Sequence, residues 1–121
     1  MTDNEIPSPK IYAVYLLIIL FVLLSTVSFG QIKVIHFNAG WNEGNGADWI
    51  MSLKDCNTKS YVDIAKDPDA QKKYKIAVVP TIIIFKDGEE VARFQADLSF
   101  KMLATKEEVQ EEIDNQLMSD F

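Results

Sequence analysis

Side chains with strong chemical reactivity are scarce in this 121-residue chain, which has one cysteine, Cys56, and one histidine, His36. A single cysteine excludes an internal disulfide and leaves a free thiol, a mixed disulfide or an intermolecular bridge. One cysteine and one histidine cannot form a Cys/His zinc site. The sequence also lacks a serine or cysteine nucleophile with a base, a phosphate-binding glycine loop and a paired-carboxylate motif. We therefore expect no metal and no cofactor.

Cys56 is predicted to follow a short helix at residues 47–54 and has Asp55 beside it. The carbonyl end of a helix and a neighbouring carboxylate both disfavour a thiolate. We therefore expect an inert or partly buried thiol. A thiol that forms mixed disulfides or dimers is the alternative.

The net charge of the chain argues against some classes of partner. The formal net charge is −6, and no basic stripe of the kind that binds phosphates is present. This balance argues against nucleic acid and against electrostatic attachment to an anionic membrane surface. The length accommodates one small domain and a leader.

The leader, residues 1–30, contains an unbroken hydrophobic run at residues 11–24. As a signal peptide it would use Lys10 as a thin basic region and be cleaved before Gln31, with Ser28 and Gly30 as the small residues of the cleavage site. As a transmembrane anchor, residues 11–29 would be just long enough, since about 17–25 residues are needed. Under either interpretation we expect the domain at residues 31–121 to be exported, either periplasmic or anchored in the inner membrane.

Hydrophobic patterns after residue 31 predict an α/β domain. The expected strands are residues 32–38, 60–65, 81–85 and 90–94, and the expected helices are residues 47–54, 67–74 and 105–117. The first strand is apolar on both faces, which favours a covered, central position. Residues 39–46, rich in glycine and asparagine, are expected to form a loop whose Asn45 caps the next helix. Thr105 and Glu108 form a capping box at the start of the last helix.

The last two strands form the most informative stretch. Residues 81–85 are β-branched and aromatic, residues 86–89 supply an Asp-Gly turn, and residues 90–94 alternate as a returning strand should. Pro80 lies just before the first of these strands, where it costs no ladder hydrogen bond.

This Val-Pro-Thr step with its hairpin resembles the C-terminal half of the thioredoxin family. Residues 34–41, VIHFNAGW, resemble the strand and tryptophan that precede that family's Cys-Gly-Pro-Cys. The resemblance covers about residues 32–117. It implies a minimal thioredoxin-like α/β fold of order βαβα-ββα, with a mixed sheet and helices on both faces, preceded by one N-terminal hydrophobic helix. It also implies that Pro80 is cis and faces the active site.

The redox motif of that family is missing. Where the family has Cys-x-x-Cys, this chain has Asn42-Glu43-Gly44-Asn45. Neither asparagine can form a thiolate, although both can cap a helix or offer amides to a partner. His36 occupies the position where the family often has a buried acid that serves the resolving thiol. With no such thiol, we expect a core or interface histidine whose ring is satisfied.

The family's backbone before the cis-proline pairs with an extended segment of its partner, and this recognition requires no cysteine. The predicted partner-binding residues are therefore Trp41, Asn42, Glu43, Gly44, Asn45, Val79 and Pro80. The alternatives are that residues 42–45 form only a capping loop and that Trp41 only packs. Phe100, Met102 and Leu103 either extend the groove or fill the core.

Three hypotheses follow. The first is a redox-inactive, exported or membrane-anchored domain that binds a protein or peptide. The second is a monothiol oxidoreductase that uses Cys56, and the third is a structural subunit of a membrane-associated assembly.

Overall fold

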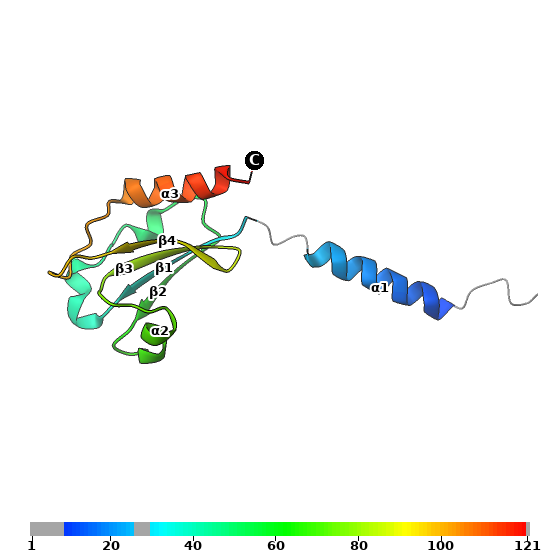
Figure 1. Ribbon diagram of the computed structural model, residues 1–121, viewed down its shortest axis with the longest axis horizontal. Helices are drawn as coiled ribbons and strands as arrows, with labels where there is room; N and C mark the ends of the chain where they lie inside the picture. The colour runs from blue at the N-terminus through cyan, green and yellow to red at the C-terminus, as the bar shows by residue number, and fades with distance from the viewer. Residues whose placement is uncertain (1–8, 26–29, 121) are drawn as a thin grey trace, which may run out of the picture.

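The computed structural model describes residues 9–25 and 30–120 (Figure 1). The predicted N-terminal helix is present as α1 (Pro9–Ser25). Within these two ranges, no helix combines the length and the apolar character needed to cross a membrane. Ser28 of the predicted cleavage site, and the end of the predicted span at residues 26–29, lie outside the described residues.

A four-stranded mixed sheet forms the centre of the domain (Figure 1). The strands are β1 (Ile32–Asn38), β2 (Thr58–Asp63), β3 (Thr81–Lys86) and β4 (Glu89–Gln95), in the spatial order β2-β1-β3-β4. β1 pairs with β2 in parallel and with β3 in antiparallel orientation, and β3 pairs with β4 in antiparallel orientation. The strand predicted to be central is therefore paired on both edges.

Side chains of β1 alternate between two apolar clusters, as strand geometry requires. On one face, Val34 lies in a cluster with Val109 and Ile113 of α3 (Lys106–Met118). On the other face, Ile35 and Phe37 lie in a cluster beside α2 (Pro68–Lys73). Figure 1 shows α3 and α2 on opposite sides of the sheet. The predicted mixed sheet with helices on both faces is confirmed.

The local signals of the hairpin and the helix starts are also confirmed. Asp87 and Gly88 both have positive φ, 52° and 86°, as the Asp-Gly turn predicts. Thr105 Oγ1 accepts a hydrogen bond from the Glu108 N–H at 3.2 Å, and the side chain of Asp67 caps α2. Pro68 is the first residue of α2, where its missing N–H costs nothing.

The segment between β1 and β2 differs from the prediction. Residues 39–46 are not an open loop, because the 3₁₀ helix η2 (Gly40–Asn45) forms there. Residues 47–54 are not an α-helix and contain only the 3₁₀ turn η3 (Ile50–Ser52), which the side chain of Asn45 does not cap. Ala47, Ile50 and Leu53 are nevertheless buried, so the segment packs against the core without forming an α-helix. The predicted order βαβα-ββα thus lacks its first α-helix.

The second strand also begins earlier than predicted. β2 starts at Thr58 because its parallel pairing with β1 already begins at Lys33. It ends at Asp63, whose carbonyl accepts hydrogen bonds from the N–H groups of Lys66 and Asp67 and so turns the chain toward α2.

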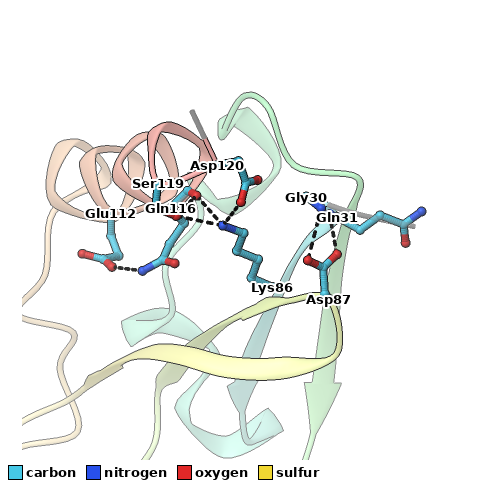
Figure 2. A network of polar contacts seen from close by, with 8 residues as sticks. All are labelled: Gly30, Gln31, Lys86, Asp87, Glu112, Gln116, Ser119 and Asp120. Carbon is cyan, nitrogen blue, oxygen red and sulfur yellow. Dashed lines mark hydrogen bonds and ion pairs between the residues drawn. The ribbon is translucent and has the colours of Figure 1, made fainter. Parts of the chain in front are cut away.

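Polar contacts at the hairpin turn join the two ends of the domain (Figure 2). The Asp87 carboxylate accepts hydrogen bonds from the backbone N–H groups of Gly30 and Gln31, at 3.2 and 3.0 Å. Lys86 Nζ donates to the Gln116 carbonyl oxygen at 2.8 Å and forms an ion pair with Asp120 at 2.6 Å. A cation at the carbonyl end of α3 is electrostatically favourable. These contacts and Asn38, the last residue of β1, lie at opposite ends of the sheet.

Candidate functional site

The predicted site residues meet where β1 ends and β3 begins. η2 follows β1 directly, and the Val79–Pro80 peptide bond, which is cis, precedes β3. The segment after β4, residues 96–105, returns to the same place. Three separate parts of the chain therefore form this end of the sheet.

Asn42 joins these three parts through its side-chain amide. This side chain is buried, with 4% of the residue exposed. Its Nδ2 lies 3.1 Å from Asn38 Oδ1, 3.1 Å from the Phe100 carbonyl oxygen and 3.4 Å from the Val79 carbonyl oxygen. An amide nitrogen carries two hydrogens, so these three acceptors share two donors. Asn42 thus links η2 to β1, to the backbone before Pro80 and to the segment after β4.

The network also returns hydrogen bonds to Asn42. Asn38 Nδ2 donates to the Asn42 carbonyl oxygen at 3.2 Å, and Asn45 Nδ2 donates to Asn42 Oδ1 at 2.9 Å. Among the residues described, no buried side-chain nitrogen or oxygen lacks a hydrogen-bond partner. A fully satisfied buried network of this kind fixes the local geometry. Among the predicted residues 42–45, Asn42 is buried, whereas Glu43, Gly44 and Asn45 are exposed.

Apolar side chains are exposed around this network. Trp41 is 68% exposed and Phe100 is 41% exposed, and their rings meet edge to face with centroids 5.2 Å apart. Leu98 and Leu103 of the same segment are also exposed. Met102 instead packs against the cluster that contains Val109, so the segment after β4 contributes both to the surface and to the core.

Phe100 is held in place by its backbone. Its φ is positive, 63°, and its N–H donates to the Asp97 carbonyl oxygen at 3.1 Å. Its own carbonyl oxygen is the one that Asn42 contacts. The ring of Phe100 lies at the surface against Trp41. The sequence does not predict this left-handed backbone conformation, because phenylalanine rarely adopts it.

Val79 and Pro80 are buried. The Val79 carbonyl oxygen accepts from Asn42, and the Pro80 carbonyl oxygen accepts from the Ala96 N–H at 3.0 Å. The hydrogen bonds found within the described residues do not include one donated by the Val79 N–H.

His36 is buried on β1, on the same side of the sheet as Val34. Its Nε2 accepts a hydrogen bond from the Ala47 N–H at 3.3 Å, and its ring meets the Tyr61 ring edge to face. Desolvation by burial lowers the pKa of His36 to about 4, so the imidazole is neutral at pH 7. The ring is a structural acceptor for the turn after η2. The backbone at Gly46 approaches this ring closely, because an added Cβ would lie 3.2 Å from His36 Cε1 and 3.0 Å from Asn38 Nδ2.

Cys56 lies at the other end of β1 from Asn42. It precedes β2, whose first residue pairs with Lys33 near the start of β1. The thiol is partly buried, and its Sγ lies 3.4 Å from the Lys54 carbonyl oxygen. Burial raises the pKa of Cys56, the Lys59 ammonium opposes this effect, and the Asp55 carboxylate reinforces it. The cause is thus mainly desolvation rather than the helix end that the sequence predicted.

The described residues contain no candidate metal site. Across residues 9–25 and 30–120, no three histidine, cysteine, aspartate or glutamate side chains are grouped so that they could hold an ion.

Comparisons with known proteins agree on the fold. No family model matches the chain. Thioredoxin Y1, chloroplastic, of Arabidopsis thaliana is 44% identical over 52 residues, which are 43% of this chain and only 30% of that protein. A mutant thioredoxin of Halobacterium salinarum superposes with a TM-score of 0.57 at 17% identity, covering 73% of this chain and 76% of that one. Reduced thioredoxin pre-protein of Schistosoma mansoni gives 0.56 at 25% identity, covering 79% and 88%. This chain has a thioredoxin-like fold.

The amide network generates a stability prediction. Asn42→Ala leaves Asn38 Oδ1, the buried Val79 carbonyl oxygen and the part-buried Phe100 carbonyl oxygen without their donor, and such unsatisfied groups are costly. We expect a loss of about 2–4 kcal/mol in the free energy of unfolding, measured by urea denaturation. Asn45→Ala removes a single part-buried bond of the same network, the one donated to Asn42 Oδ1, and is expected to lose only about 1 kcal/mol. Equal losses in the two variants would mean that Asn42 does not hold this end of the sheet together.

The neutral histidine generates a pH prediction. The pKa of His36 is about 4 in the folded chain and about 6.5 when unfolded, so the unfolded state takes up a proton first as the pH falls. Stability is therefore fully present above pH 6.5 and decreases toward pH 4, by at most roughly 3 kcal/mol. His36→Gln keeps an acceptor for Ala47 but cannot titrate in this range. The two proteins are compared by urea denaturation at several pH values. The difference between their free energies of unfolding should shrink between pH 6.5 and 4. A constant difference would contradict the lowered pKa of His36.

Proposed function

We propose that this chain is a redox-inactive domain of thioredoxin-like fold that binds an extended segment of a protein or peptide without forming a covalent bond. The observation that carries the proposal is the Asn42 network, in which a buried amide occupies the position that corresponds to a cysteine in thioredoxins. The same network supports an exposed aromatic pair, Trp41 and Phe100. The site therefore retains a recognition surface in place of a reactive thiol.

Thiol–disulfide exchange needs a thiolate as the attacking group. Asn42 and Asn45 supply none, and their amides are engaged with each other and with the backbone. Cys56 lies at the opposite end of β1, and its raised pKa disfavours a thiolate. These observations favour the binding hypothesis over a monothiol oxidoreductase.

Exposed aromatic side chains are typical anchors of binding surfaces. Trp41 and Phe100 form one continuous apolar surface, and Leu98, which is 95% exposed, lies two residues before Phe100. The Asn42 amide joins Phe100 to the Val79 carbonyl oxygen, so this surface adjoins the backbone before Pro80. The unused Val79 N–H offers an extended partner a main-chain hydrogen bond, as in strand addition.

Within this proposal, the predicted residues have different roles. Trp41 contacts the partner, and Glu43, Gly44 and Asn45 are exposed beside it. Val79 is buried, so only its backbone N–H, which is unpaired within the described residues, is offered to the partner. Asn42 and Pro80 are buried and position the surface instead. Phe100, one of the open alternatives in the sequence, joins Trp41 as a contact residue.

Peptide binding can be tested with a displayed library of random peptides selected against the folded domain. Affinities of selected peptides, measured by calorimetry, should fall about tenfold or more in Trp41→Ser and Phe100→Ser, because each loses a desolvated aromatic contact. Met118→Ser is a matched control, since Met118 is equally exposed at the end of α3. Cys56→Ser should leave the affinity unchanged. Failure to select any peptide, or binding that needs Cys56 and is reversed by a reductant, would refute the proposal.

Export of the domain is part of the proposal, and it is supported by the hydrophobic run at residues 11–24. Expression of the full chain in a bacterium, followed by intact mass measurement of the protein released from the periplasm, tests it. We expect a mature chain that begins at Gln31. A full-length chain that remains in the cytosolic fraction would contradict export.

A further inference from the structure

A cleft of about 550 Å³ opens beside η2, at the end of β1 and β2. Its polar lining includes His36, Tyr61, Glu43, Asp48, Asp63 and Lys66. The size is typical of sites that hold a small ligand or one side chain of a partner. Neither the aromatic pair nor the Asn42 network accounts for this set of polar groups.

His36 provides a donor that the protein itself does not use. The residue is only 6% exposed, and its Nε2 is occupied as the acceptor of the Ala47 N–H. The proton of the neutral ring is therefore on Nδ1. Within the described residues, Nδ1 has no hydrogen-bond partner. Every fully buried side-chain nitrogen or oxygen of these residues does have a partner, so Nδ1 is partly exposed. The cleft that His36 lines is where Nδ1 could donate to an oxygen of a ligand.

The charges of the lining select a cation. Three carboxylates, Glu43, Asp48 and Asp63, face one ammonium, Lys66, so the formal charge of the lining is −2. No ion pair of the described residues involves any of these four groups. The ring of Tyr61 also lines the cleft and adds a surface over which a cation can lie. A ligand that suits the cleft thus carries both a positive charge and an acceptor oxygen.

We propose that this cleft binds a basic side chain, arginine or lysine, of the same extended peptide, with a peptide carbonyl oxygen of that segment accepting from His36 Nδ1. The inference rests on the proposed function and specifies its partner as a basic peptide. The geometry fits one continuous peptide, because η2 carries Trp41 of the aromatic pair and Glu43 of the cleft two residues apart. The net charge of −6 favours encounter with such a partner.

The test uses short acetylated and amidated peptides that differ at one central residue, which is arginine, citrulline or glutamate. Citrulline keeps the shape of arginine and removes its charge. In NMR titrations of the labelled domain, the arginine peptide should shift the ring signals of His36 and Tyr61 in a saturable way. Its affinity should exceed that of the citrulline peptide by about fivefold or more, and the glutamate peptide should not shift these signals.

Charge-matched variants separate the cleft from the net charge of the domain. Glu43→Gln and Asp63→Asn should each weaken the arginine peptide about threefold or more, whereas Asp114→Asn on the exposed face of α3 should leave it unchanged. Equal affinity for the arginine and citrulline peptides, or equal weakening by Asp114→Asn, would overturn the inference. A peptide that alters Trp41 fluorescence without shifting His36 and Tyr61 would overturn it and leave the proposed function intact. No response at either place would count against both.

Discussion

The buried side chain of Asn42 is the constraint on which this end of the molecule depends. A buried amide must have partners for its donors and acceptor, because an unpaired polar group in the interior is costly. The partners available here belong to β1, to the peptide before Pro80 and to the segment after β4. Satisfying one side chain therefore brings three distant parts of the chain together. The exposed Trp41–Phe100 pair lies beside this junction, because the Phe100 carbonyl oxygen is one of its acceptors.

The same hydrogen bonds stabilise the segment after β1 in a thioredoxin-like fold that has asparagines at positions 42 and 45. A thiol at the start of the segment after β1 contributes reactivity, and an asparagine there contributes hydrogen bonds that fix the segment as η2. His36 follows the same logic, because its ring accepts the Ala47 N–H and so anchors the turn after η2. Asn42, Asn45 and His36 thus position the backbone at this end of the sheet, and the proposed binding function rests on the exposed surface and the cleft.

Most of the fold was accessible from the sequence because its signals are local. The apolar runs of β1 and β3, the Asp-Gly turn and the cap at Thr105 act over a few residues, and the structure has them at the predicted places. The segment after β1 was mispredicted as an α-helix, because apolar residues three and four positions apart, such as Trp49, Ile50 and Leu53, suit an α-helix as well as the 3₁₀ turn that forms. The amide network could not be read from the residues alone, since its bonds to Val79 and Phe100 span 37 and 58 positions. Only the spacing of Asn38, Asn42 and Asn45 hinted at side chains that meet on one face of the segment.

The central claim, that a buried amide of Asn42 organises the site, is tested most directly by NMR of the asparagine side chains in the free domain. The account predicts that the Asn42 amide hydrogens exchange slowly with solvent and show contacts to Phe100, whereas the amide hydrogens of the exposed Asn115 exchange rapidly. Equally rapid exchange of both side chains, with no contact between Asn42 and Phe100, would show that the network does not exist in solution and would contradict the account.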